Sequence, residues 1–228
     1  MIETGAPQIL DWDSDFWGVR IARVGDPDVD EWAREHGVAC AYLLVPADDS
    51  ASAHRAEERG FRLMDVRVEL DAPVARTEQP VRAHREDDVE RLRAIARRNH
   101  ADTRFYADPS FPRERCDELY DTWIRRSCEG WADAVLVAEA ERSPAGYVSL
   151  HERGDAGSIG LIGVDAAARG RGVGEALVRG ALDWCAQRGL ERCTVVTQGR
   201  NVPAQRLFQK CGFRTSSVDL WFHKWWSA

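Results

Sequence analysis

The chain has 228 residues, of which 44% are apolar and 30% are charged, and its formal net charge at pH 7 is −7. This length and apolar content suffice for one large domain or two small ones with a buried core, which excludes a disordered or fibrous protein. The acidic excess argues against a general nucleic-acid binder, whose affinity depends on a basic face. The sequence contains no run of about 18 apolar residues, the length that a membrane-spanning helix needs.

The start of the chain lacks a basic segment followed by an apolar one, so we expect a cytoplasmic protein with no membrane partner. Its six cysteines are scattered, without a Cys-x-x-Cys pair or a Cys/His cluster at metal-ligand spacing. We therefore expect reduced cysteines in the core and no metal site.

The first third of the chain mixes strand and helix patterns. In order, it predicts a buried strand over 39–45, a short helix over 52–59 and an alternating strand over 61–70. Residues 71–80 contain two prolines and no apolar period, which is typical of a linker. The sequence thus predicts a small N-terminal α/β domain (1–75) before a larger domain (80–228).

One short pattern occurs twice. Arg59-Gly60-Phe61-Arg62 follows a predicted helix and precedes a predicted strand, and Cys211-Gly212-Phe213-Arg214 recurs in the same context. Chance and a partial duplication both explain a match of this length. A duplication would make the N-terminal domain a remnant half of the second domain's fold.

The larger domain reads as a mixed α/β unit. Its predicted elements are helices over 86–99 and 113–127, strands over 134–140, 146–152 and 158–164, a helix over 173–188, a strand over 193–197, a helix capped by Asn201 and a final strand over 213–224. The order is a meander of strands that leads into a β-α-β unit.

The positive charge is local. Residues 165–214 contain nine Lys or Arg against four Asp or Glu, a net charge of +5. Between a predicted strand and the long helix that follows it lie Arg169, Gly170, Arg171, Gly172, Val173 and Gly174. Alternating glycines let the backbone approach a ligand, and the free N–H groups of a helix start attract anions. Since the spacing fits neither a P-loop nor G-x-G-x-x-G, we expect a diphosphate that belongs to neither a nucleoside triphosphate nor a dinucleotide.

The spacing Arg169-x-x-Gly172-x-Gly174 resembles the Q/R-x-x-G-x-G/A loop of the GCN5-related N-acetyltransferases (GNAT family), which holds the pyrophosphate of acetyl-CoA. A second motif, Asn201-x-x-Ala204-x-x-Leu207-Phe208-x-x-x-Gly212-Phe213, resembles that family's other CoA-contacting helix. The resemblance implies a GNAT fold with a central mixed, mostly antiparallel sheet flanked by helices. It also implies acetyl-CoA as cosubstrate and direct acetyl transfer to a primary amine in a ternary complex.

Other segments resemble a narrower group of that family, the enzymes that acetylate TDP-4-amino-4,6-dideoxygalactose. They are residues 11–18, 103–105, 146–150, 159–161 and 181–184. The implied acceptor is the amine of a nucleotide-linked deoxyamino sugar. An acetyltransferase for a protein N-terminus, an antibiotic or a polyamine is the alternative.

In the family, the strand before the loop is splayed from its neighbour, and pantetheine binds in the gap. This implies that the backbone of Leu161, Ile162 and Val164 contacts the cofactor, with one N–H facing the thioester oxygen. On the second motif the implied contacts are Asn201, Ala204 and Leu207. These residues also have interpretations that need no ligand. The strand side chains could simply belong to the core, and Arg169 and Arg171 could be solvated surface charges. Asn201 could serve only as the cap of its helix.

Phe208 stands where the family carries a tyrosine, the proposed general acid that protonates the CoA thiolate. A phenyl ring has no proton to give. Water or another donor could supply the proton, catalysis could be weak, or the chain could be a non-catalytic CoA-binding module. An unperturbed thiol pKa near ~8.5 lets the thiolate leave with little help.

The proton of the acceptor amine needs a base, for which His151 is a candidate. Ser149 shares its strand face, because side chains two residues apart point the same way. His100, Arg104 and Tyr106 lie in the loop between the first two helices of the larger domain, which suits a sugar-nucleotide pocket and equally suits an ordinary connector. Tryptophans near both termini are expected in the core, with a homodimer surface as the alternative.

Overall fold

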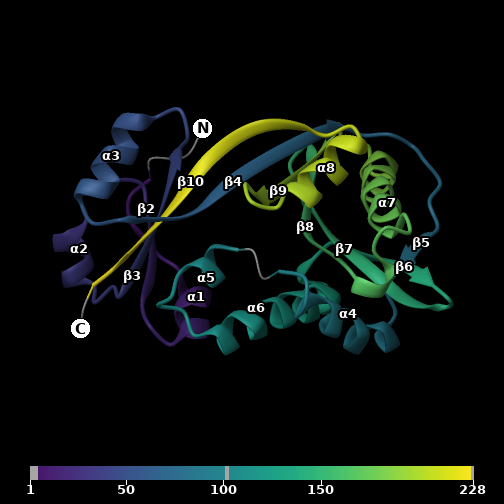
Figure 1. Cartoon of the computed structure of the whole chain (residues 1–228), viewed down its shortest axis with the longest axis horizontal. Helices are drawn as coiled ribbons and strands as arrows, with labels where there is room; N and C mark the ends of the chain where they lie inside the picture. The colour runs from purple at the N-terminus through teal and green to yellow at the C-terminus, as the bar shows by residue number, and fades with distance from the viewer. Residues whose placement is uncertain (1–4, 101–102, 227–228) are drawn as a thin grey trace.

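The computed structural model describes residues 5–100 and 103–226, which form one ten-stranded sheet with the order β1-β2-β3-β10-β4-β9-β8-β7-β6-β5 (Figure 1). The elements of the first part are β1 (Gln8–Ile9), α1 (Asp11–Trp17), β2 (Ile21–Val24), α2 (Asp30–Glu35), β3 (Cys40–Pro46), α3 (Ser50–Glu58) and β4 (Arg62–Pro73). The apolar run of β3 is buried along most of its length.

The second part begins after residue 80. Its elements are β5 (Val81–Ala83), α4 (Val89–Ala96), α5 (Arg104–Ala107), α6 (Arg113–Arg126), β6 (Ala134–Ala140), β7 (Ser143–Arg153), β8 (Ala156–Val164), α7 (Val173–Gln187), β9 (Arg192–Gln198), α8 (Val202–Lys210) and β10 (Arg214–Trp225), with short 3-10 turns at Glu86–Asp88 and Ala166–Ala168 and a π-type turn at Ser127–Trp131. The mixed, mostly antiparallel sheet that the sequence predicts is confirmed.

The helices cover both faces of the sheet. One core cluster lies beneath α7 and α8, and a second lies between the sheet and α4, α5 and α6. A third cluster packs α2 and α3 against β2 and β3. Within the described ranges, no helix is long and apolar enough to cross a membrane.

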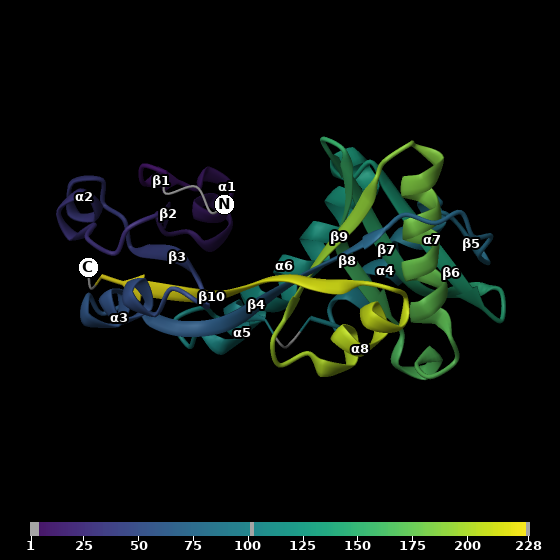
Figure 2. The ribbon, with the colours of Figure 1, turned by 90° about the horizontal axis from the view of Figure 1, so that it is seen from above.

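Two long strands connect the parts of the molecule. β10 is paired with β3 on one side and β4 on the other, while β4 is paired with β10 and β9. Figure 2 shows β4 and β10 running side by side from the N-terminal elements to α8. A strand of the first part therefore lies inside the sheet of the second, and the last strand of the chain lies inside the sheet of the first.

The two parts contain units of equal dimensions. The first is β3, α3 and β4 (40–46, 50–58, 62–73) and the second is β9, α8 and β10 (192–198, 202–210, 214–225), with every bound offset by 152 residues. The helix caps also match: Asp49 accepts a hydrogen bond from the N–H of Ser52, and Asn201 accepts one from that of Ala204. Exchanging the two units converts the order β3-β10-β4-β9 into the same order read from its other end, so the repeated Gly-Phe-Arg pattern marks corresponding positions in space.

Several boundaries differ from the sequence-based expectation. The predicted strand over 61–70 continues to Pro73, because its far end pairs with β9, so only 74–80 connect the two parts. The predicted helix over 86–99 is a 3-10 turn followed by the shorter α4. The division into two domains stays a prediction.

The residues expected in the core are mostly there. All six cysteines are free thiols and five are buried, Cys128 being half-buried. The indoles of Trp12, Trp17 and Trp225 pack against the cluster beneath α5 and α6. A homodimer stays a prediction.

Candidate functional site

A gap opens between β8 and β9. The two parallel strands are paired only from Ala156↔Arg192 to Ile159↔Val195, although both continue for several residues. On its other side β8 carries a β-bulge, because two residues lie between Ile159 and Ile162 where β7 has one. Such a bulge bends a strand, so it accounts for the divergence of β8 from β9.

The loop after β8 is shaped by two left-handed glycines. Gly170 and Gly172 have φ values of +74° and +82°, a region that side-chain-bearing residues rarely adopt. α7 begins directly afterwards at Val173, so the unpaired N–H groups of its first turn lie beside the loop. A Cβ on Gly174 would lie 3.0 Å from Leu207 Cδ2, which shows how closely α7 approaches α8 here.

The two loop arginines differ in how firmly they are held. Arg169 Nη2 donates a hydrogen bond to Asn99 Oδ1 at 2.9 Å. Arg171 lies 3.5 Å from Glu141, and both of these side chains are largely exposed. Both guanidinium groups are on the surface beside the start of α7, where they can meet an anion.

The strand before the loop offers its backbone only in part. The N–H of Leu161 donates to Ser149 Oγ at 2.8 Å, and that of Val164 to Asn99 Oδ1 at 3.4 Å. Ile162 lies opposite Val148 in the ladder with β7. A thioester oxygen bound at Leu161 would therefore share this N–H with Ser149 or displace its hydroxyl.

The second motif forms α8. Asn201 Oδ1 accepts a hydrogen bond from the Ala204 N–H at 3.2 Å, so the side chain caps the helix. Phe208 is only 1% exposed and its ring centroid lies 5.7 Å from that of Phe213, within the core beneath α7 and α8. Its assignment to catalysis stays a prediction, and the buried ring contributes packing in any case.

His151 and Ser149 lie over the bulge of β8. A Cβ built on Gly160 would lie 2.8 Å from His151 Nε2 and 3.0 Å from Ser149 Oγ. The imidazole is 6% exposed and meets Trp131 edge-on, with ring centroids 5.2 Å apart. Burial, aided by the charge of Arg153, lowers the pKa of His151, so the ring is neutral at pH 7 and can accept a proton.

A cavity of about 150 Å³ lies on the α5 and α6 side of the sheet, next to the end of β9. We call it the acceptor cavity; its walls include Asp65, Arg104, Tyr120, Trp123, Val196 and Trp221. Val196 follows the last residue of β9 that is paired with β8, which places the cavity beside the gap.

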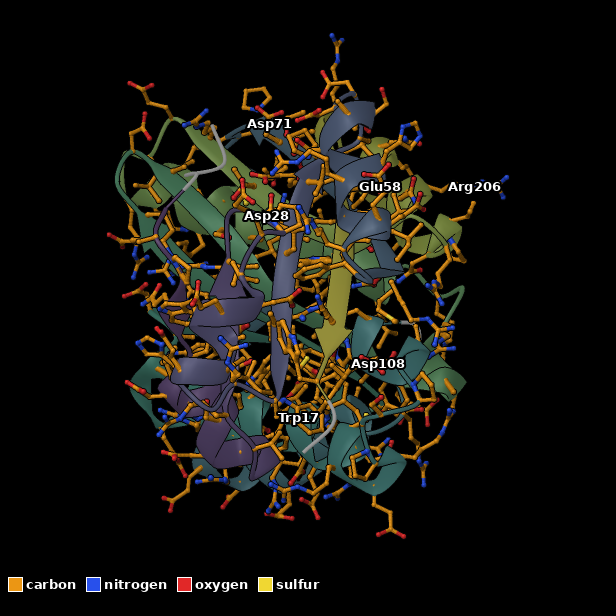
Figure 3. The ribbon with its side chains drawn as sticks, turned by 90° about the vertical axis from the view of Figure 1, so that its left-hand side faces the viewer. Trp17, Asp28, Glu58, Asp71, Asp108 and Arg206 are labelled. Carbon is orange, nitrogen blue, oxygen red and sulfur yellow. The ribbon has the colours of Figure 1, made fainter. Side chains whose placement is uncertain are left out.

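Arg104 is held firmly at this cavity. Its guanidinium lies 4.1 Å from the ring centroid of Tyr42 and 4.5 Å from that of Trp221, positions that favour cation–π attraction. Its Nη1 lies 2.9 Å from His223 Nε2, and His223 Nδ1 lies 2.7 Å from Asp108 Oδ2. Burial lowers the pKa of His223 to about 4, so a neutral imidazole donates to Asp108 and accepts from Arg104. Figure 3 shows Asp108 in the interior near the end of β10, whereas Arg206 extends outward.

The other predicted acceptor residues do not line the cavity. His100 stacks on Tyr120 with centroids 4.4 Å apart, and its Nε2 lies 3.2 Å from the hydroxyl of Tyr147. Burial lowers the pKa of His100 to about 4. Tyr106 donates its hydroxyl proton to Asp117 at 2.5 Å. His100 thus supports the wall from behind, and Tyr106 is directed elsewhere.

The sequence analysis did not predict that residues of β4 and β10 line the acceptor cavity. Asp65 is 4% exposed and accepts a hydrogen bond from the Val66 N–H at 2.9 Å. Burial raises the pKa of Asp65, and the nearby Arg200, at 3.6 Å, partly offsets that effect. The signal was the alternation of Asp65, Arg67 and Glu69 in a strand whose other face is apolar, which places three ionisable groups on one face.

Within the described part of the chain no group of three His, Cys, Asp or Glu residues could hold a metal ion. The loop and the helix start combine unpaired backbone donors with local positive charge, which suits the diphosphate of the acetyl-CoA that the family resemblance implies.

Comparisons with known proteins agree with this geometry. A model of the "Acetyltransferase (GNAT) family" matches residues 98–213. The dTDP-fucosamine acetyltransferase of Escherichia coli O6:H1 is 27% identical over 94% of this chain and 96% of that protein. The spore coat polysaccharide biosynthesis protein SpsD of Bacillus subtilis is 25% identical over 60% of this chain and 48% of that protein.

A solved structure shares the fold. It is a putative acetyltransferase of the GNAT family from Novosphingobium aromaticivorans, with a TM-score of 0.62 and 19% identity over 100% of this chain and 91% of that one. The family match spans the gap, the loop and α8, and the shared fold extends over the N-terminal strands as well. The chain therefore belongs to the GNAT family and is an acetyl-CoA-dependent N-acetyltransferase.

Proposed function

We propose that the protein transfers the acetyl group of acetyl-CoA to the amine of a nucleotide-linked deoxyamino sugar. The observation that carries the proposal is the gap between β8 and β9, which has the glycine loop at its end and the acceptor cavity beside it. Similarity to a dTDP-fucosamine acetyltransferase over nearly the whole chain supports the choice of acceptor.

The cofactor half of the site consists mainly of backbone. Gly170 and Gly172 let the diphosphate approach the start of α7, whose N–H groups and dipole favour negative charge. Arg169 and Arg171 add positive charge there. The thioester then lies along β8, near the bulge at Gly160.

The acceptor half must deliver a neutral amine. A sugar amine arrives largely as an ammonium, which the carboxylate of Asp65 attracts and His151 or a water molecule deprotonates. The nitrogen then bonds to the acetyl carbon, the C–S bond breaks and the electron pair leaves with sulfur. Phe208 cannot protonate that thiolate, and a thiol pKa near ~8.5 makes an acid there dispensable.

The test has two stages. First, acetyl-CoA should raise the thermal midpoint, whereas Gly172→Glu, which places a carboxylate where the diphosphate is expected, should abolish that shift. Second, free thiol should be released with TDP-linked amino sugars and not with aminoglycosides, polyamines or peptides.

The outcomes separate the alternatives. Release of thiol with an aminoglycoside, a polyamine or a peptide alone would overturn the choice of acceptor. Stabilisation by acetyl-CoA with no thiol released by any amine would favour a non-catalytic CoA-binding module, for which the phenyl ring of Phe208 is the observation in favour.

A further inference from the structure

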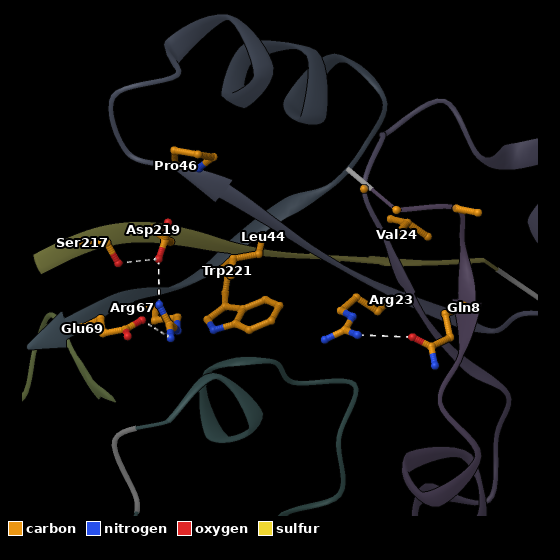
Figure 4. Close-up of a pocket in the computed structure, with 13 residues that line it drawn as sticks. Gln8, Arg23, Val24, Leu44, Pro46, Arg67, Glu69, Ser217, Asp219 and Trp221 are labelled. Atoms are coloured by element: carbon orange, nitrogen blue, oxygen red, sulfur yellow. Dashed lines mark hydrogen bonds and ion pairs between the residues drawn. The ribbon is translucent and has the colours of Figure 1, made fainter. Parts of the chain in front are cut away.

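A second, larger hollow adjoins the acceptor cavity. It encloses about 820 Å³ over β1, β2, β3 and β10, and Arg67 and Trp221 line both spaces. In Figure 4, Arg67, Trp221 and Arg23 follow one another across its floor. We call this space the N-terminal hollow.

The repeated units explain why the two spaces are alike. The shared offset of 152 residues relates four wall positions of one space to four of the other: Leu44 to Val196, Pro46 to Gln198, Asp65 to Ser217 and Arg67 to Asp219. The N-terminal hollow is thus the counterpart, in the first unit, of the acceptor cavity in the second. The two meet where β4 and β10 pair.

The volumes show that a large acceptor needs both spaces. Small-molecule sites usually enclose ~300–1,000 Å³. The acceptor cavity, at about 150 Å³, is below this range and suits a single sugar ring. The rest of a larger acceptor has to leave the cavity, and the N-terminal hollow begins at the same Trp221.

The arginines that line the two spaces indicate which part of the acceptor passes from one space into the other. Arg67 is neutralised by two carboxylates, Asp219 at 2.8 Å and Glu69 at 2.6 Å. Within residues 5–100 and 103–226, neither Arg23 nor Arg104 has a carboxylate within 4.0 Å: Arg23 donates to Gln8 at 3.2 Å, and Arg104 is bonded to a neutral imidazole. Among the described residues, each space is therefore lined by one arginine that forms no salt bridge. The Asp13 carboxylate is close enough to both for their charges to offset part of the burial effect that raises its pKa.

Resting on the function proposed above, we propose that the N-terminal hollow binds the nucleoside diphosphate end of the acceptor. The sugar occupies the acceptor cavity, the diphosphate passes Trp221 between Arg104 and Arg23, and the nucleoside lies against the apolar wall of the hollow. That wall consists of Val24, Leu44 and Pro46. A diphosphate can be bound by two guanidinium groups that form no salt bridge, because guanidinium groups bind phosphate oxygens well.

The experiment measures binding of TDP alone by isothermal titration calorimetry, so it needs no turnover. Arg23→Gln should weaken TDP binding at least tenfold. Arg62→Gln removes an exposed arginine at the start of β4 that lines neither space, and it should leave the TDP Kd within twofold of the wild-type value. Thermal midpoints check that each variant is folded.

A second pair of variants isolates charge from shape. Leu44→Glu and Leu44→Gln place side chains of equal size in the hollow, and only the first adds a negative charge. Leu44→Glu should bind TDP at least fivefold more weakly than Leu44→Gln. Equal affinities of these two variants, or an unchanged affinity of Arg23→Gln, would overturn the proposal.

The experiments distinguish failure of this proposal from failure of the proposed function. If acetyl-CoA binds and a free amino sugar is acetylated, but wild-type protein does not bind TDP, the hollow has another purpose while the acetyltransferase assignment stands. If TDP binds as described and acetyl-CoA gives no thermal shift, the site in the hollow stands and the acetyl-transfer proposal fails.

Discussion

Gly160 in the bulge of β8 offers a sharp test of the site geometry. In Gly160→Ala the new methyl group would lie 2.8 Å from His151 Nε2, whereas ordinary contacts begin at 3.4 Å, so the imidazole has to move by about 0.6 Å. His151 is buried and held edge-on by Trp131, which is itself 51% exposed and can yield. The substitution therefore displaces His151 without removing it.

The structure sets the size of the effect. Overpacking of this kind costs about 1–3 kcal/mol, and the exposed Trp131 places Gly160→Ala near the lower end. For a chain of this length 1 kcal/mol corresponds to roughly 2–4 °C in Tm. Turnover should fall by about tenfold or more if His151 serves the acceptor amine, because small displacements near reacting atoms are costly. The acetyl-CoA Kd should change less than turnover does, since the glycine loop expected at the diphosphate lies beyond the end of β8 and is not disturbed.

A double-mutant cycle with His151→Ala completes the test. Removing the imidazole relieves the overlap, so Gly160→Ala should cost about 0.5–1 kcal/mol less in the His151→Ala background, measured by urea unfolding. The remaining contact with Ser149 Oγ at 3.0 Å keeps the relief incomplete. Equal costs in the two backgrounds would show that His151 does not lie over the bulge.

Three further outcomes are expected. Gly172→Ala forces a side chain into a left-handed conformation, which should cost about 1–2 kcal/mol of stability and raise the acetyl-CoA Kd at least tenfold by calorimetry. Burial lowers the pKa of His223 to about 4, so below pH 6.5 this imidazole is protonated in the unfolded chain but stays neutral in the folded protein until about pH 4. The free energy of unfolding should therefore fall by about 2 kcal/mol from this group between pH 6.5 and pH 5. Urea titrations should show a smaller fall over the same pH range in His223→Gln. Asp65→Asn should lower kcat/KM for the amine by about 10–100-fold in a free-thiol assay and leave the acetyl-CoA Kd unchanged. A rise in the acetyl-CoA Kd by the same factor would mean that Asp65 supports the structure and does not act on the amine.

The strand, loop and helix expected to hold the cofactor were predictable because their signals are local. The strand β8, the glycine loop and α7 are consecutive, and the order of apolar stretch, alternating glycines and amphipathic helix defines them without any distant partner. The cap of α8 by Asn201 follows from the same kind of short-range rule. Even Gly170 and Gly172, which turn out to be left-handed, are positions where glycine itself is the signal.

Apart from Arg104, the walls of the acceptor cavity were not predictable, because residues far apart in the chain form them. Arg67 is bonded to Asp219 and Arg104 to His223, pairs that are more than 100 residues apart. No periodicity reports such contacts. The strand containing Asp65 was predicted, and so were β9 and β10, but the pairing of these three strands was not, so the direction in which the charged face points could not be known.

Because β4 and β10 each lie among the strands of the other part, the acceptor cavity is built from both parts of the molecule. β4 lies between β9 and β10 and contributes Asp65 and Arg67, while β10 lies between β3 and β4 and contributes Trp221. Each half of the chain thus supplies one of the two strands that form the floor. A catalytic segment that began at residue 80 would keep the glycine loop and α7 but would lack β4, leaving β9 with an unpaired edge beside the gap. If the proposed function holds, the second half alone supplies the expected cofactor site, whereas the acceptor cavity needs both halves.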